Sequence, residues 1–352
     1  MARYESAIRR VVPYVPGEQP KDKNIIKLNT NENPYPPSPL VLAEKESMDM
    51  DIFRRYPDPA VSDLKNVIAQ HLSVRPEQVF VGVGSDDVLS MCFLTYFNDP
   101  DRPVLFPDIT YSFYDVWAEM YRIPYRTVPL TADFRIDPAD YSVENGGIVI
   151  ANPNAPTGIL LPAEEVGKIV RNNPESLVIV DEAYVDFGGE SMIPYLDRYP
   201  NLLVVQTFSK SRSLAGLRIG YAVGSEELIH ALEDVKYSFN SYTMNAAAIR
   251  MGTASVKDET YFTEMCARIV ETREESAERF RSMGFTVLPS KTNFLFVSHR
   301  VPAEKIFTKL RERKIFVRYF KKPRIDNFLR ITIGTPEQMD ALFEALGEIL
   351  GE

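Results

Sequence analysis

Apolar residues along most of this chain form short runs that alternate with stretches of helical spacing. From about residue 60 the spacing predicts helices at 61–72, 85–97, 112–122 and 162–172. Between them, continuous apolar runs predict strands at 78–84, 102–108, 147–154, 176–184, 201–210 and 217–224. Strands that are apolar on both faces and alternate with helices are typical of a mainly parallel sheet covered on both sides.

The two ends of the chain follow other patterns. The first 40 residues are rich in proline, which blocks helix formation, so this segment either hangs free or lies across another surface. A long helical stretch at 241–283 is followed by alternating strands and helices. We therefore predict an N-terminal arm at 1–40, a large domain at 41–240 and a small α+β domain at 241–352, which suits a chain of 352 residues.

Composition narrows the classes of function. The net charge of −9 disfavours binding to nucleic acid backbones. Cys92 and Cys266 lie among apolar neighbours, and the three histidines are far apart, so no metal site is predicted. No apolar run approaches the ~20 residues that span a bilayer, and the N-terminal sequence lacks the apolar core of a signal peptide. We expect a cytoplasmic protein that does not contact membranes.

A glycine-rich turn follows the first predicted strand. Gly82-Val83-Gly84-Ser85-Asp86 leads into the helix at 85–97, with Ser85 expected as the helix cap. Free N–H groups at a helix start suit a phosphate. The turn has neither the full dinucleotide-binding pattern nor a Walker A lysine, so it indicates an anion site without fixing the ligand.

Two charged residues come at the ends of buried strands. Asp181 closes an apolar run, where a carboxylate is costly unless it meets a cation or a strong donor. A protonated pyridine nitrogen would serve, and so would a salt bridge within the protein. Lys210 ends the run 201–210 and is a candidate nucleophile. Ser209 and Arg218 flank it, and a hydroxyl with a guanidinium suits a phosphate group.

Two further side chains follow predicted strands. Tyr111 comes after the strand at 102–108 and could stack on a flat ring, although a packing role is about equally consistent with its position. Asn154 lies in the proline-rich loop 151–158, which is either a tight connection or a rigid support that aims its amide at a ligand oxygen.

In this order, the segments resemble the pyridoxal 5′-phosphate (PLP) enzymes of fold type I, the aspartate-aminotransferase-like superfamily. Within it the chain most resembles the histidinol-phosphate aminotransferase family. The FSK…GLRIGY pattern with DEAY upstream is specific for the superfamily. The similar segments, from residue 13 to 335, are PYVPG, LNTNENP, RYPDP, GVGSDD, NPNAPTG, DEAYVDF, TFSKSRSLAGLRIGY, VRYF and LRITIGT. The resemblance implies an α/β fold, with a large domain on a mainly parallel seven-stranded sheet and a smaller α+β domain.

The resemblance also implies a PLP site with catalytic Lys210, Asp181 and Tyr184. Lys210 would hold the cofactor as a Schiff base and move the proton between the substrate Cα and the cofactor. Asp181 would keep the pyridine nitrogen protonated, which makes the ring an electron sink. Asn154 and Tyr184 would hydrogen-bond the phenolic oxygen, and Tyr111 would stack on the ring. The phosphate would be held by Gly84, Ser85, the backbone N–H of Asp86, Ser209 and Arg218.

Substrate binding is implied for residues near both ends of the chain. Arg330 would bind the carboxylate of glutamate in one half-reaction and the phosphate of histidinol phosphate in the other. Arg318 resembles a second phosphate contact, with a surface salt bridge as the alternative. Tyr14, Asn31 and Glu32 would lie near the substrate.

The resemblance further predicts a homodimer. Tyr56, in RYPDP, resembles a tyrosine that reaches the cofactor phosphate of the neighbouring subunit, and the N-terminal arm would add dimer contacts. Its other partners would be a small-molecule amino donor and a 2-oxo acid acceptor.

Two departures bear on the substrate. Val83 stands where the family often has asparagine, and the segment 318–327 is short and charged. We predict transamination between histidinol phosphate and 2-oxoglutarate. The alternatives are an aminotransferase for aromatic or other amino acids and a PLP enzyme that resembles threonine-phosphate decarboxylase.

Overall fold

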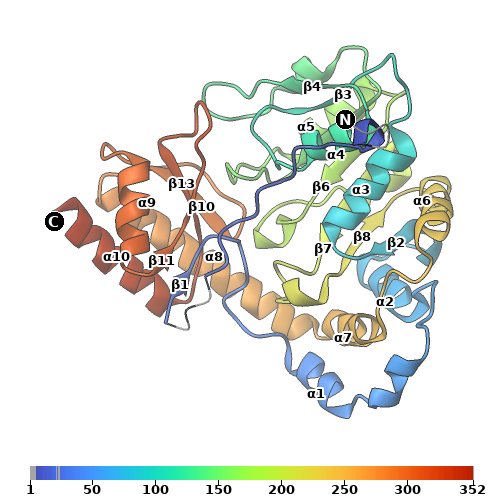
Figure 1. Cartoon of the computed structure of the whole chain (residues 1–352), viewed down its shortest axis with the longest axis horizontal. Helices are drawn as coiled ribbons and strands as arrows, with labels where there is room; N and C mark the ends of the chain where they lie inside the picture. The colour runs from blue at the N-terminus through green and yellow to red at the C-terminus, as the bar shows by residue number, and fades with distance from the viewer. Residues whose placement is uncertain (1–4, 21, 23, 352) are drawn as a thin grey trace.

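A seven-stranded sheet forms the centre of the computed structural model, which describes residues 5–20, 22 and 24–351 (Figure 1). The strands lie in the order β2-β8-β7-β6-β5-β3-β4. β8 is antiparallel to both of its neighbours, and the other neighbouring pairs are parallel. The strands are β2 (Val79–Gly82), β3 (Val104–Pro107), β4 (Tyr125–Val128), β5 (Gly147–Ala151), β6 (Val178–Asp181), β7 (Leu202–Thr207) and β8 (Gly220–Val223). The predicted mainly parallel α/β sheet is confirmed.

Helices cover both faces of this sheet because its strands are buried on both sides. Val178 and Val180 belong to one core, and Ile179 between them belongs to the other. The first core includes side chains of α2 (Ser62–Leu72), α5 (Ala163–Asn172) and α7 (Ala246–Lys257). The second includes side chains of α3 (Ser85–Tyr96), α4 (Tyr114–Tyr121) and α6 (Glu226–Phe239).

Several local expectations differ from the structure. α3 begins at Ser85 itself, and its cap position is held by Gly84, so the expected cap at Ser85 is wrong. The helical stretch 241–283 consists of α7 and α8 (Glu259–Ser282), which meet at Asp258. The sequence pattern did not predict β4, whose first three residues are exposed and give no apolar run, nor α6 and α1 (Pro39–Ser47).

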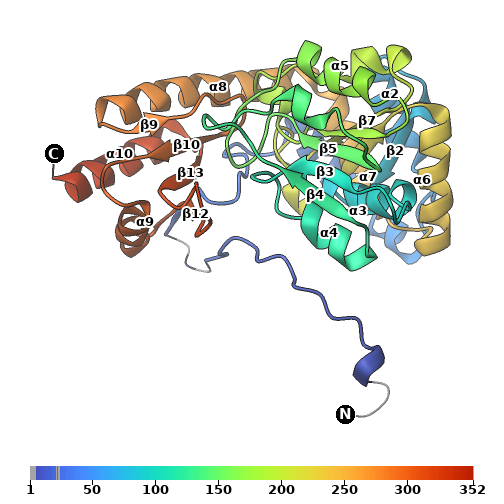
Figure 2. The same ribbon diagram turned by 90° about the horizontal axis from the view of Figure 1, so that it is seen from above.

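A second, smaller sheet lies beside the large one (Figure 2). It is antiparallel, in the order β12-β13-β10-β9, and α8 runs from it toward the seven-stranded sheet. In addition, β1 (Ile26–Lys27) of the N-terminal segment pairs in parallel with β11 (Ile315–Phe316). The remaining elements are β9 (Thr286–Val287), β10 (Phe294–Ser298), α9 (Ala303–Glu312), β12 (Arg318–Tyr319), β13 (Phe328–Thr332) and α10 (Pro336–Leu350).

The small sheet has a core of its own, separate from the two cores on the faces of the large sheet. The core of the small sheet includes Leu28 from the N-terminal segment and Cys266 and Phe280 from α8. Residues of α7 belong to one of the two cores of the large sheet. The three-part division of the chain with limits at residues 40 and 240 stays a prediction. Among the described residues, no helix is both long and apolar enough to cross a membrane.

Candidate active site

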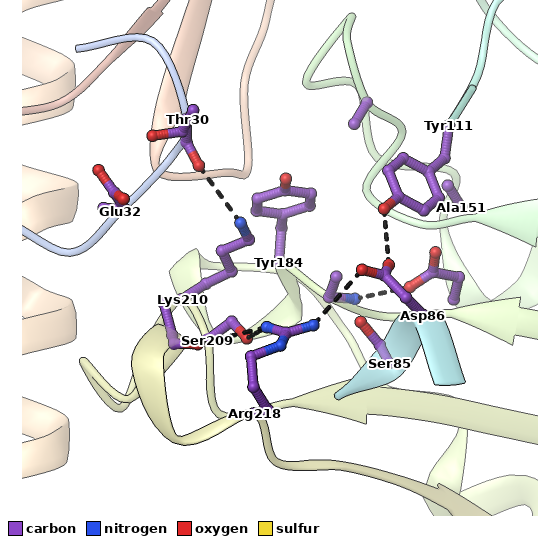
Figure 3. A pocket seen from close by; sticks show the side chains of 14 residues that line it. Thr30, Glu32, Ser85, Asp86, Tyr111, Ala151, Tyr184, Ser209, Lys210 and Arg218 are labelled. Atoms are coloured by element: carbon purple, nitrogen blue, oxygen red, sulfur yellow. Dashed lines mark hydrogen bonds and ion pairs between the residues drawn. The ribbon is translucent and has the colours of Figure 1, made fainter. Parts of the chain in front are cut away.

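A cavity opens where the parallel strands of the large sheet end, opposite the small sheet (Figure 3). Loops that follow the carboxyl ends of neighbouring strands meet at this edge, which is where open α/β sheets bind ligands. The N-terminal segment completes the wall. The lining residues are Thr30, Glu32, Ser85, Asp86, Tyr111, Ala151, Ala155, Asp181, Ala183, Tyr184, Ser209, Lys210, Ala215 and Arg218.

Lys210 lies in the loop after β7 and extends its amine into the cavity (Figure 3). Its Nζ donates to the carbonyl oxygen of Thr30 at 3.4 Å and lies 5.8 Å from the centre of the Tyr184 ring. Asn33 holds the backbone at this point, because its Nδ2 donates to the carbonyls of Lys210 and Ser211 at 3.0 and 3.1 Å. Among the described residues the amine therefore makes one long hydrogen bond, while the backbone that carries it is held in place by Asn33.

Asp181 ends β6 and is almost fully buried. Burial raises its pKa to about 6, although the Tyr114 hydroxyl and the Ala183 N–H donate to its oxygens at 2.8 and 3.2 Å. No cationic side chain among the described residues donates a hydrogen bond to this carboxylate. The salt bridge that sequence analysis left open is thus not formed here, and the carboxylate faces the cavity.

The glycine turn and Arg218 meet at one corner of the cavity, and we call it the anion-binding corner because backbone N–H groups and a guanidinium suit an anion. Ser85, the first residue of α3, follows Gly84, and no side chain caps this helix start. Its first N–H groups are therefore available to a ligand. Arg218 donates from Nη1 to Ser209 Oγ and from Nη2 to Asp86 Oδ2, both at 3.4 Å.

Tyr111 is tied to the same corner, because its hydroxyl donates to Asp86 Oδ1 at 2.6 Å (Figure 3). Burial raises its pKa, and the nearby Asp86 charge adds to the shift. A neutral phenol from the loop after β3 therefore lines the same cavity as Asp181.

Tyr184 joins the cavity to the N-terminal segment. Asn31 is buried with a left-handed backbone (φ 56°), and its Nδ2 donates to the Tyr184 hydroxyl at 2.8 Å. Asn31 is also fixed by its N–H, which donates to Thr332 Oγ1 at 3.0 Å. Its side chain thus bridges the two sheets.

Asn154 is predicted from the sequence to bind the cofactor, but it is not among the residues that line the cavity. Its side chain makes hydrogen bonds with neighbouring loop residues instead. It is buried, and its Nδ2 donates to the Ile109 carbonyl and to Thr157 Oγ1, each at 3.0 Å. Thr110 Oγ1 donates to its Oδ1 at 2.8 Å. Asn154 therefore orients the loop that carries Tyr111.

Two arginines of the small sheet are neighbours across strands. Arg318 of β12 is paired in register with Arg330 of β13, so both project from the same face. Arg330 donates to the Asn29 carbonyl at 3.2 Å, while its Nε is buried without a partner among the described residues. Burial lowers its pKa, and the nearby Tyr184 acts in the opposite direction. Two like charges this close favour an anion between them.

Residues of the N-terminal segment lie against Arg318. Arg318 Nη2 donates to the Val15 carbonyl at 3.3 Å, so the expected alternative of a surface salt bridge is not formed. Tyr14 stacks on Phe113 with ring centres 4.2 Å apart. Arg318 and Tyr14 also line one hollow of the surface together. Glu32 is paired with Lys27, and it faces the main cavity.

Tyr56 lies outside the cavity. Its side chain is 82% exposed and packs against Tyr242, with ring centres 4.6 Å apart. Its loop is anchored by the buried Lys236, whose Nζ donates to the Pro59 carbonyl at 2.8 Å.

Sequence analysis missed several residues that shape the site. Tyr114, which hydrogen-bonds Asp181, gave no signal beyond its place in an aromatic helix. Thr30 and Asn33 lie in the segment LNTNENP. Their contacts with Lys210 form only because the N-terminal segment packs against the large sheet. The contact of Tyr114 with Asp181 joins α4 to the end of β6 across 67 residues, so no local pattern could have shown it.

A family model, curated relatives and solved structures that are similar to this chain all include aminotransferases. Residues 23–346 match the model of the family described as aminotransferase class I and II. The chain is similar to histidinol-phosphate aminotransferase 1 of Hydrogenovibrio crunogenus, with 54% identity over 99% of both chains. Among solved structures it is similar to histidinol-phosphate aminotransferase from Sinorhizobium meliloti in complex with pyridoxal-5′-phosphate, with a TM-score of 0.85, 27% identity and 93% and 91% of the two chains covered.

A third similarity concerns the fold alone. L-threonine-O-3-phosphate decarboxylase from Porphyromonas gingivalis has a TM-score of 0.79 at 22% identity, with 93% of this chain and 100% of that chain covered.

Proposed function

This chain belongs to the class I and II aminotransferases, and we propose that it transfers the amino group of histidinol phosphate to 2-oxoglutarate. The products are imidazole acetol phosphate and glutamate. The similarity to histidinol-phosphate aminotransferase 1 of Hydrogenovibrio crunogenus, with 54% identity over 99% of both chains, supports this substrate. One observation carries the assignment: a lysine, a buried carboxylate and an anion-binding corner meet in one cavity.

The residues of the cavity fit the cofactor, pyridoxal 5′-phosphate. Asp181 has a burial-raised pKa and lacks a cationic partner among the described residues, so a protonated ring nitrogen would complete it. The uncapped start of α3, with Ser209 and Arg218, would hold the phosphate. Lys210 would carry the covalent attachment, and the ring of Tyr111 would stack on the cofactor.

When bound, the cofactor accepts the electrons that remain after the substrate Cα loses its proton. The chain supplies the rest. Lys210 Nζ is the base at the substrate Cα, because it is the amine that faces the cavity. The Tyr184 hydroxyl, oriented by Asn31, is placed to donate to an oxygen in the cavity.

Substrate recognition rests on the paired arginines. Arg330 and Arg318 present two guanidinium groups on one face of the small sheet, and Arg330 Nε has a free N–H. A dianionic phosphate uses both groups, whereas a carboxylate such as that of glutamate needs Arg330 alone. Tyr14 closes the same hollow beside Arg318. This arrangement favours a phosphorylated amine over an aromatic amino acid.

A homodimer is the second part of the proposal. Tyr56 is highly exposed, and the exposed apolar side chains Met50, Phe53 and Phe239 lie close to it or to Tyr242 in sequence. A second copy of the chain would cover them. Tyr56 does not line the cavity of its own chain. In a dimer, its hydroxyl would reach the anion-binding corner of the partner.

The test is the absorbance spectrum of the purified protein supplied with PLP, before and after addition of L-histidinol phosphate without a 2-oxo acid. We expect a visible band that disappears as the amine is consumed and returns on addition of 2-oxoglutarate. Borohydride reduction followed by mass spectrometry should find the adduct on Lys210. A Lys210→Ala variant is the control and should show neither.

Three results would count against parts of this assignment. A band that glutamate or an aromatic amino acid removes and histidinol phosphate does not would overturn the substrate. Carbon dioxide release in place of amino transfer from an amino acid substrate would favour a decarboxylase. No adduct on Lys210 would overturn the cofactor attachment.

A further inference from the structure

The turn that connects β12 to β13 crosses from the small sheet to the large domain. It spans residues 320–327 and belongs to the short, charged segment 318–327 that the sequence indicates as bearing on the substrate. Lys322 Nζ donates to the carbonyl of Asp108 at 2.7 Å. Arg324 donates from Nη2 to the carbonyls of Leu130 and Thr131 at 3.0 and 2.6 Å. These acceptors lie after β3 and β4, at the cavity edge of the large sheet.

Arg324 makes two more contacts with the same region. Its Nη1 lies 3.3 Å from Asp108 Oδ2, and its guanidinium lies 5.3 Å from the centre of the Phe134 ring. Its backbone is left-handed, with φ 69°. A residue other than glycine keeps that conformation only where its surroundings determine it. The turn is therefore shaped by its contacts with the large domain.

An apolar cluster lies under these polar contacts. Ile325 of the turn is 2% exposed and packs with Ile109, Leu130 and Phe134 of the large domain and Phe296 of β10. An exposed ion pair alone would contribute little. Here the guanidinium covers a buried apolar contact and satisfies two carbonyls, so its loss loosens the whole turn.

The turn joins two parts of the site. Its strands carry Arg318 and Arg330, which lie in register. Its anchor, Asp108, lies three residues before Tyr111, whose hydroxyl donates to Asp86 in the anion-binding corner. The spacing between the paired arginines and the cavity of Lys210 thus depends on how the turn is held.

We propose that Arg324 is a positioning residue that fixes the paired arginines at the distance from Lys210 that a phosphorylated amine requires. This rests on the proposed function, since Arg318 and Arg330 bind the anionic end of the substrate there. Arg324 is not among the residues that line the cavity. Its loss changes how well the substrate spans the cavity, and it leaves the lysine, Asp181 and the anion-binding corner in place.

The experiment compares Arg324→Ala and Arg324→Lys with a control, Arg135→Ala, in the PLP-loaded enzyme. Arg135 lies in the same large-domain loop, and its exposed side chain pairs with Asp133 of that loop. We measure KM and kcat for histidinol phosphate and for glutamate, the PLP dissociation constant and Tm. The split between KM and kcat distinguishes positioning from a general loss of structure.

For Arg324→Ala we expect the KM for histidinol phosphate to rise about tenfold while kcat stays within about threefold, because uniform binding is lost. The KM for glutamate should rise less, since a carboxylate can use Arg330 alone. PLP affinity should not change. Arg324→Lys should fall between wild type and Arg324→Ala, because an ammonium reaches fewer of the acceptors. Arg135→Ala should match wild type.

Unchanged KM values in Arg324→Ala would overturn the proposal, and so would a parallel loss of PLP affinity, kcat and Tm. An equal effect in Arg135→Ala would also overturn it. If the wild type converts glutamate and not histidinol phosphate, the substrate assignment fails separately. The glutamate KM then decides the proposal for Arg324 by itself: a rise of several-fold supports it and no change overturns it.

Discussion

Asp181 shows how a single residue is prepared for a ligand. Its carboxylate is buried at the end of β6 with two neutral donors, and burial raises its pKa from 3.8 to about 6. The folded chain without ligand therefore holds an ionised group at a cost in free energy. A bound cation offsets that cost, because an opposite charge stabilises the ionised form.

This shift predicts a pH-dependent stability of the ligand-free protein. Since the pKa is higher in the folded state, the folded chain binds more protons than the unfolded chain between pH 3.8 and about 6. The free energy of unfolding therefore falls as pH rises through that window, by at most about 3 kcal/mol. Asp181→Asn lacks this titration, so urea unfolding should show the variant gaining on wild type between about pH 4 and pH 6.

The matched comparison removes the contribution of all other carboxylates, which both proteins share. A stability difference between wild type and Asp181→Asn that does not vary across the window would contradict a raised pKa. With PLP added at neutral pH, wild type should gain stability relative to Asp181→Asn, because only the wild-type carboxylate meets the ring cation.

At the scale of elements, the turn into α3 depends on the absence of a side chain. Gly84 has a left-handed backbone (φ 87°), and a Cβ there would lie 2.5 Å from Arg218 Nη2. Both the turn and the guanidinium would have to move. The glycine thus allows the helix start and Arg218 to meet at one corner.

Gly84→Ala should therefore weaken PLP binding about tenfold or more, since it displaces a charge-assisted contact to the phosphate. Gly216→Ala is the control, because a Cβ at this exposed glycine near Arg218 meets nothing within 4 Å. Equilibrium dialysis or fluorescence titration with PLP gives both constants. Equal affinities for the two variants would show that the corner tolerates the side chain and would refute its proposed use.

At the scale of the whole molecule, the site is assembled from distant parts of the chain. The N-terminal segment supplies Thr30 and Asn31, the large sheet supplies Lys210 and Asp181, and the small sheet supplies Arg330. Tyr56 is left facing outward from this assembly. A residue of that kind fits a site that is shared between two copies of the chain.

Shared sites predict complementation between inactive variants. Tyr56→Ala and Lys210→Ala should each be impaired, the first through PLP affinity and the second completely. A mixed dimer contains one site with both native residues, so co-expressed variants should recover up to about half of the activity per dimer. Light scattering should give the mass of two chains. A monomer, or mixtures no more active than their components, would refute a shared site.

The sequence determined most elements of the large sheet and most of the chemistry, although β4, α1 and α6 gave no clear pattern. Alternating apolar runs and helical spacing required a mainly parallel sheet, because strands buried on both faces need helices on both sides. Strand order along the chain then placed Gly84, Asp181 and Lys210 at the carboxyl ends of strands. Their residue types, with the family resemblance, identified PLP and an aminotransferase.

Tertiary structure decided what touches what. Asp181 meets Tyr114, Asn31 meets Tyr184, and Arg324 meets Leu130 across separations of 67, 153 and 194 residues. No local pattern encodes such contacts, since they depend on how helices, turns and the N-terminal segment pack after the sheets form. Burial, which sets the pKa of Asp181, and the spacing of the paired arginines from Lys210 are properties of that packing alone.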